Sequence, residues 1–319
     1  MLQLTFSVAL LAWLINRVGL NAIVRTLAGV SWNWYGLAFL LFLGNVLLRA
    51  YRWYLLVGAL EQQAPYGHLV YLYFVGFFFN NFIPSGFGGD VVKVISLRQD
   101  RAPNAEDLSS VVMDRLTGLI GSASIALVAL AWNRTQLWLG ASGTDLNLPP
   151  VLLLATVLIC LGIPFGFIFI RRIDPLQLVG NLMPFTRPIT SSSGLRKFVQ
   201  TIRRYPLGAL TSALSVSIPF TIGLVAIQYA IARALSVQVP LYVFPLFVPI
   251  IAIINVLPVS FNGLGMREGV YQFLFVPVGV SSASAIAMSL AFYFLRVAAG
   301  LIGGLLYAIK NTRRLVQGV

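Results

Sequence analysis

Long uninterrupted apolar runs constrain this 319-residue chain more than any other feature of its sequence. A run such as "VLLLATVLICLGIPFGFIFI" (151–170) has the ~20 residues that a helix needs to cross the hydrocarbon core of a bilayer. Only 10% of the residues are charged, against roughly 25% in soluble domains. Too few polar side chains are present to cover a soluble protein of this size. The sequence therefore predicts an all-α polytopic membrane protein, because barrel strands would alternate in polarity instead.

The apolar runs predict about eight membrane helices and two segments that cannot cross as one simple helix. The expected spans are residues 2–16, 33–57, 66–83, 106–131, 151–170, 207–234, 240–258 and 281–309. The interrupted segments are 84–105 and 259–280. No basic stretch precedes the first run and no clear cleavage site follows it, so it is expected to be a membrane helix and not a cleaved signal. The chain is expected to form a single transmembrane domain, residues 1–319.

The distribution of basic residues predicts the orientation in the membrane. A net charge of +13 is compatible with nucleic-acid binding, but the basic residues gather in connections between the expected spans. Those in the connection 171–206 are Arg171, Arg172, Arg187, Arg196, Lys197, Arg203 and Arg204. Connections rich in Lys and Arg favour the cytoplasmic side. We therefore expect this connection and the C-terminal tail to be cytoplasmic in a multi-pass protein of the cell (plasma or inner) membrane, with no nucleic-acid partner.

This orientation requires the two interrupted segments to be re-entrant or broken. Spans 66–83 and 106–131 would both run outward, so the segment between them must bring the chain back through the membrane. Segment 259–280 must do the same in the opposite sense. Irregular backbone at membrane depth is tolerated only where it is buried in protein or lines a wet cavity.

The two interrupted segments also share a motif. "NNFIPSGFGGDVVK" (80–93) aligns without gaps with "INVLPVSFNGLGMR" (254–267). The aligned pairs are Asn81 with Asn255, Pro84 with Pro258, Phe87 with Phe261, Gly89 with Gly263, and Lys93 with Arg267. With the predicted orientation, residues 1–140 and 150–319 form an inverted-topology repeat. Such repeats in transporters place the substrate site near the midplane, where broken helices meet.

Polar residues in these segments, with charges inside the spans, form the predicted substrate-binding site. Intramembrane charges are costly and usually functional. Arginine offers bidentate donors to phosphate and lysine a point charge, while glycines let the backbone approach a head group. The predicted residues are Asn80, Asn81, Pro84, Gly88, Gly89, Asp90, Lys93, Asp114, Arg115, Asn255, Pro258, Gly263, Gly265, Arg267, Glu268 and Arg296. The expected ligand is a membrane phospholipid or a lipid-linked anion.

The same charges have a second interpretation as internal ion pairs that lock helices together. The possible pairs are Asp114 with Arg115 or Arg296, and Arg267 with Glu268 or Asp90. The two interpretations overlap, because a carboxylate can hold an arginine in place until a phosphate displaces it. A carboxylate that titrates would also allow proton coupling.

Other basic residues are expected at the membrane surface. Arg49 and Arg52 share a helix face in "LLRAYRW", among aromatic residues that favour the interface. The stretch "LRKFVQTIRR" (195–204) has an apolar stripe typical of a helix lying on a leaflet, with each base contributing roughly 1 kcal/mol on anionic lipid. Its basic residues are Arg196, Lys197, Arg203 and Arg204. Metal-ligand spacing, a nucleotide-binding loop and a nucleophile motif are all missing from the sequence, so no enzyme activity, cofactor or metal is expected.

Four motifs together resemble the transmembrane, flippase-like region of lysylphosphatidylglycerol synthases: "LLRAYRW", "NNFIPSGFGGDVVK", "MDRLTGLIG" and "GLGMREG". The resemblance covers nearly the whole chain. It implies a helical bundle that moves an aminoacylated or glycosylated phospholipid, or a polyprenyl-phosphate carrier, between leaflets. The motif positions it implies are Asn81, Pro84, Gly89, Asp90, Lys93, Arg115, Gly263, Gly265, Arg267 and Glu268.

The chain departs from that family pattern in three respects, one of which is its short first span. It has no counterpart of the cytosolic aminoacyl-transferase domain, so lysine transfer to lipid is not expected. It has Asp114–Arg115 where the family often has Glu-Arg. These departures leave the cargo open, and the oligomeric state is also left open. The leading hypothesis is a lipid flippase or scramblase, and the alternative is a non-transporting partner that presents lipid to a separately encoded glycosyltransferase or lipid synthase.

Overall fold

The computed structural model describes residues 7, 10, 12–14, 16–82, 87–98, 102–138, 150–182, 192–256 and 263–316. Every regular element in these ranges is a helix, which confirms the predicted all-α class. In the first half the α-helices are α2 (Leu20–Ala28), α3 (Trp32–Gly58), α4 (Tyr66–Phe82), α5 (Gly88–Ser96) and α6 (Ala105–Trp138). Then follow α7 (Pro150–Arg172), α8 (Pro175–Leu182), α10 (Ser193–Arg204), α11 (Leu207–Ala234), η2 (Leu241–Val243), α12 (Phe244–Ile254), α13 (Met266–Phe275), η4 (Val276–Val278) and α14 (Ser282–Val316).

Four helices in the described part of the chain are long and apolar enough to cross a bilayer. They are α3, α6 up to Trp132, α11, and α14 up to Thr312, and they match four of the predicted spans. The expected span 66–83 is a 17-residue helix, and 240–258 is shortened to a helical stretch of Leu241–Ile254. Most of 2–16 lies outside the described residues. The number of eight membrane helices therefore stays a prediction.

Helices α4 and α5 pack against each other in an antiparallel hairpin. The Asn80 side chain near the end of α4 accepts a 2.7 Å hydrogen bond from the Gly89 backbone N–H at the start of α5. At the other end, the His68 ring lies 3.0 Å from the Ser96 carbonyl oxygen. Glycine is required at position 89, because an added Cβ would overlap the Gly76 carbonyl oxygen. The hairpin thus brings both flanks of its connection, 83–86, to one place.

Helices α12 and α13 stand at the corresponding place in the second half of the chain and also contact each other. Their connection is 257–262. The predicted site residues Pro84 and Pro258 belong to these two connections and lie outside the described residues.

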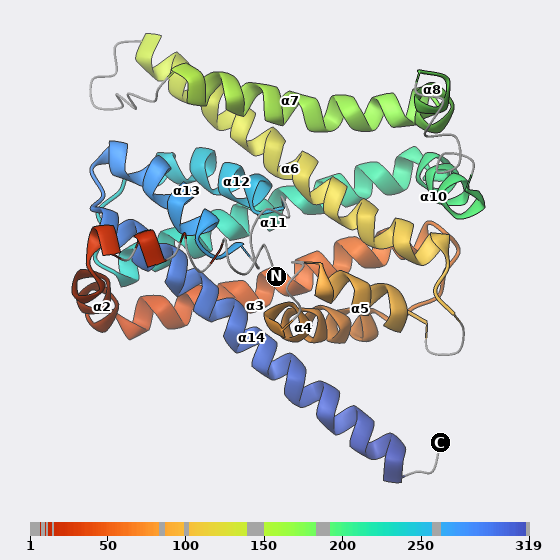
Figure 1. Cartoon of the computed structure of the whole chain (residues 1–319), viewed down its shortest axis with the longest axis horizontal. Helices are drawn as coiled ribbons and strands as arrows, with labels where there is room; N and C mark the ends of the chain where they lie inside the picture. Colours follow the sequence, from red (N-terminus) through yellow and green to blue (C-terminus); the bar gives the residue numbers. More distant parts are fainter. Residues whose placement is uncertain are drawn as a thin grey trace.

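The two halves of the chain contact each other reciprocally. α3 packs along α11, its counterpart by order. α4 packs on α14 while α12 packs on α6, and α2 contacts α14 while α10 contacts α6. Figure 1 shows α2 at one end of the bundle and α10 at the opposite end.

Small residues allow the closest of these contacts. Gly300, Gly303 and Gly304 form a stripe on α14 that faces α4. A Cβ on Gly303 would overlap the Phe74 carbonyl oxygen, so only glycine permits this approach. Close backbone packing through small residues is a main source of association between membrane helices.

The amphipathic helix α10 differs from the expectation that its apolar stripe lies in the membrane surface. Val199 and Ile202 are buried, and Ile202 packs with Met113 of α6 and Leu56 of α3. Its stripe is therefore covered by protein. Arg196, Lys197 and Arg204 are exposed and Arg203 is partly exposed, so only the basic face is free to meet a surface.

Candidate functional site: a basic cavity among the helices

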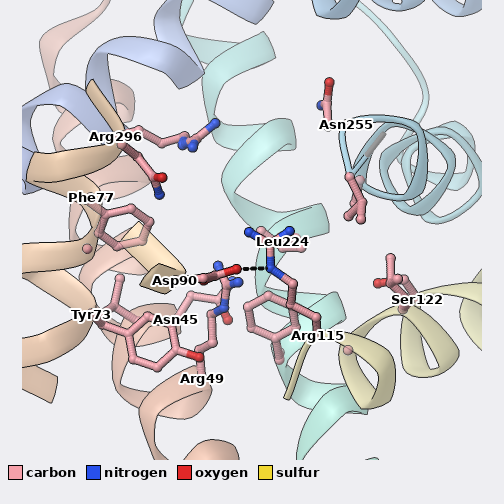
Figure 2. A pocket seen from close by; sticks show the side chains of 18 of the residues that line it. Asn45, Arg49, Tyr73, Phe77, Asp90, Arg115, Ser122, Leu224, Asn255 and Arg296 are labelled. Carbon is pink, nitrogen blue, oxygen red and sulfur yellow. Dashed lines mark ion pairs between the residues drawn. The ribbon is translucent and has the colours of Figure 1, made fainter. Parts of the chain in front are cut away.

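A cavity of about 250 Å³ lies where the two helical hairpins meet. Asn80 and Phe87, which flank the first connection, line it together with Val256 and Gly263, which flank the second. α3, α6, α11 and α14 supply the other walls. The predicted meeting of the two interrupted segments at one chamber therefore agrees with the geometry (Figure 2).

Basic side chains dominate the polar lining of this cavity. Those among the described lining residues are Arg49, Arg52, Lys93, Arg115 and Arg296. Asp90 is the one carboxylate in the described lining. It forms an ion pair with Arg115, drawn as a dashed line in Figure 2, and its Oδ1 lies 3.7 Å from the Lys93 Nζ.

Asp114 lies just behind the cavity wall and binds Arg52. Its Oδ1 accepts a 2.8 Å hydrogen bond from the Arg52 Nε, and its Oδ2 accepts one from the Tyr73 hydroxyl. Gly118 makes room for the guanidinium, because a Cβ there would lie 2.7 Å from the Arg52 Nη1. The observed partner is thus Arg52 and not Arg115 or Arg296. Adjacent residues of a helix point about 100° apart, which directs Asp114 and Arg115 to different neighbours.

The five basic residues exceed the nearby carboxylates. The two carboxylates are Asp90 and Asp114, and subtracting their charges from those of the five cations leaves a formal excess of three positive charges. Aromatic rings face several of the cations: the Lys93 Nζ lies 3.4 Å from the Tyr73 ring centre, and the Arg115 guanidinium 4.4 Å from that of Phe87. Such contacts stabilise a cation by about 0.5–2 kcal/mol without neutralising it. The cavity is therefore suited to an anion.

Neutral polar groups complete the lining. Asn45 is 5% exposed, and its Oδ1 has no hydrogen-bond partner among the described residues. It fits beside α11 only because position 223 is glycine, where a Cβ would lie 2.8 Å from that oxygen. The Asn255 Oδ1 likewise has no partner in the described ranges, and Ser122 lies on the same side of the cavity in Figure 2. A ligand can therefore find both charged and neutral hydrogen-bonding groups here.

The structure separates the predicted site residues into two sets. Those that line the cavity are Asn80, Asp90, Lys93, Arg115, Asn255, Gly263 and Arg296. Those described but outside the lining are Asn81, Gly88, Gly89, Asp114, Gly265, Arg267 and Glu268. Asn81, for example, lies at the contact between α4 and the α14 glycine stripe.

Arg267 and Glu268 lock the start of α13 instead of facing the cavity. The Glu268 Oε2 accepts a 2.6 Å hydrogen bond from the Gly265 N–H, and its Oε1 lies 3.0 Å from the Arg267 Nη2. The Arg267 Nε donates to the Ser289 Oγ of α14 at 2.8 Å. The predicted pairing of Arg267 with Glu268 is thus confirmed, whereas Asp90 pairs elsewhere. Gly265, at φ 80°, takes a left-handed conformation that favours glycine at this helix start.

The aromatic neighbours of Arg49 and Arg52 suggested that both lie at the membrane surface, and this prediction is wrong. Both line the cavity, and Arg52 is 1% exposed. With Asn45 they follow i, i+4, i+7 spacing and so occupy one face of α3, whereas Tyr51 and Tyr54 lie on its exposed faces. That spacing was a usable signal for the charged wall. The cavity is also lined by Ser122, Tyr73 and Phe87, which the sequence did not predict.

A metal ion in a protein of this kind would need several His, Cys, Asp or Glu side chains close together. No three such side chains gather among the described residues. The polar lining instead consists of guanidinium, ammonium, amide and hydroxyl groups.

The fold and the cavity define a multi-pass helical membrane protein with an internal basic site. Residues 1–304 match the family described as "Lysylphosphatidylglycerol synthase TM region", so the chain belongs to this family, as its motifs predicted. A UPF0104 membrane protein from Methanothermobacter thermautotrophicus is 26% identical over 327 aligned residues, which cover 96% of this chain and 93% of that relative.

Proposed function

We propose that this protein is a lipid flippase or scramblase without an enzymatic step of its own. The observation that carries the proposal is the formal excess of three positive charges in a cavity surrounded by apolar helices. Charge buried in such surroundings is costly, and an entering anion offsets that cost. Arginine and lysine favour phosphate in particular. The cargo is therefore a phosphate-bearing lipid, whose acyl chains stay in the bilayer while the head group crosses.

The reciprocal packing supports an inverted-topology repeat as the moving architecture. Exchange of the two halves maps the contact of α4 with α14 onto that of α12 with α6. In this proposal the hairpins α4–α5 and α12–α13 are re-entrant segments that enter from opposite leaflets. Rocking of one half against the other would open the cavity to each leaflet in turn.

Translocation by purified protein in liposomes tests the proposal. We expect wild-type protein to move fluorescent phosphatidylglycerol between leaflets, and Arg115→Gln to slow this about tenfold or more by removing a charge-assisted phosphate contact worth ~1.5–3 kcal/mol. Arg25→Gln is the matched control, because Arg25 is exposed on α2, outside the cavity lining.

The outcomes separate the two hypotheses for this family member. Equal rates for Arg115→Gln and wild type would show that the basic cavity is not the route. A wild-type protein that binds lipid but moves none would favour the non-transporting partner that presents lipid to a separately encoded glycosyltransferase or synthase.

A further inference from the structure

Among the described residues in and just behind the cavity wall, both carboxylates already have partners, so neither is available to receive an amine. Asp90 is engaged by Arg115 and Lys93, and Asp114 by Arg52 and Tyr73. The two connections outside the described residues, 83–86 and 257–262, contain no Asp or Glu in the sequence. A ligand ammonium group would therefore meet cations, and like charges brought together out of water cost several kcal/mol.

The neutral lining offers partners for hydroxyl groups instead. Within the described part of the chain the Asn45 and Asn255 side-chain oxygens have no hydrogen-bond partner, and the absence of a Cβ at Gly223 makes room for Asn45. An unmet buried acceptor costs free energy, so a ligand hydroxyl that donates to it is favoured. In Figure 2, Asn255 lies across the cavity from Arg49.

The volume limits the size of the head group. A cavity of about 250 Å³ is below the ~300–1,000 Å³ of pockets that take drug-sized ligands. One phosphate with a small attached group fits this space.

We infer that the ligand of this cavity is the phosphate ester of a small polyol that carries no free amine. The inference rests on the proposed function, since it names the head group of the same site. Cations from α3, α5, α6 and α14 hold the phosphate, and the amides of Asn45 and Asn255 accept hydrogen bonds from the polyol hydroxyls. An aminoacylated or ethanolamine head group is rejected by its positive charge.

Binding to detergent-solubilised full-length protein tests this selectivity by calorimetry with two short-chain lipids. Dihexanoyl phosphatidylglycerol and dihexanoyl phosphatidylethanolamine share tails and phosphodiester and differ in a diol against an amine. We expect the Kd for the glycerol lipid to be lower by about tenfold or more, because the amine would add like-charge repulsion. Asn255→Asp should shrink this preference, because it places a carboxylate in the cavity, whereas Asn33→Asp, at an exposed position outside the lining, should preserve it.

Each result decides the inference. Equal binding of the two lipids, tighter binding of the ethanolamine lipid, no binding of either, or an unchanged preference in Asn255→Asp would overturn it. Binding of sn-glycerol 3-phosphate as tight as that of the glycerol lipid would support the head-group chemistry and assign it to a soluble ligand. Selective binding without translocation would contradict the proposed function alone, and translocation without selectivity would contradict this inference alone.

Discussion

Asp90 is the residue that most directly competes with a ligand for the cavity. Its carboxylate pairs with Arg115 and lies 3.7 Å from the Lys93 ammonium, the two cations best placed on this wall for a phosphate. An incoming anion must share those donors with Asp90, which stays bound to them. Asp90 therefore offsets the cost of burying the charges of Arg115 and Lys93, and by the same contacts it weakens ligand binding.

Asp90→Asn tests this competition at the residue scale. With the carboxylate gone, Lys93 and Arg115 would serve the ligand alone, and charge-assisted hydrogen bonds of ~1.5–3 kcal/mol predict a Kd for phosphatidylglycerol lower by about tenfold. Calorimetry on the solubilised protein measures it. Glu61→Gln removes the same charge at an exposed position and should leave the Kd unchanged. Weaker binding in Asp90→Asn would mean that Asp90 helps to hold the ligand.

At the element scale, the contact between α4 and α14 positions one side of the site. α4 carries Asn80, and α14 carries Arg296, both of which line the cavity. The glycine stripe on α14 sets how closely the two helices approach. Because α4 is one arm of the first hairpin, this contact also fixes where the hairpin ends.

Gly303→Ala should separate these two helices and destabilise the protein. The added methyl group would overlap the Phe74 carbonyl oxygen, and overpacking of this kind costs about 1–3 kcal/mol. Thermal unfolding in detergent should show a lower midpoint. Gly44→Ala is the matched control, since no atom lies within 4 Å of a Cβ there and alanine favours the helix. Equal midpoints for Gly303→Ala and wild type would show that the helices can shift apart without cost.

At the scale of the whole molecule, the arrangement of elements carries the transport proposal. The two amphipathic helices α2 and α10 occupy opposite ends of the bundle, and the C-terminal end of α14 lies toward the α10 end (Figure 1). α10 exposes Arg196, Lys197 and Arg204. If basic residues favour the cytoplasmic side, α10 and the C-terminal end face the cytoplasm and α2 faces outward.

Single-cysteine labelling measures this orientation. Cys160, the lone cysteine, is first changed to Ala, and either Arg25→Cys on α2 or Lys197→Cys on α10 is then added; both positions are exposed. A membrane-impermeant maleimide should label Arg25→Cys in intact cells and Lys197→Cys only after permeabilisation. Labelling of both from the same side would contradict the inverted repeat and the alternating-access proposal.

The class of the protein and the helix interruptions that border the basic cavity were determined by the sequence itself. The apolar runs allow no soluble fold, because their surface cannot be covered by the few polar residues present. The paired motifs around 80–93 and 254–267 marked the two places where helices are interrupted, since Gly, Pro and Asn end helices for local steric reasons. Such interruptions can be predicted from one segment of the sequence, without knowing which other segments pack against it.

The choice of partners among the charges was decided only by the tertiary structure. Asp114 binds Arg52, 62 residues away, and not its neighbour Arg115. Arg267 donates hydrogen bonds to Glu268 and Ser289, whereas Lys93, at the matching position of the motif, lines the cavity. Which charges meet depends on the rotation of each helix about its axis and on how closely glycine lets helices approach. Those quantities come from packing between distant segments, and no local pattern encodes them.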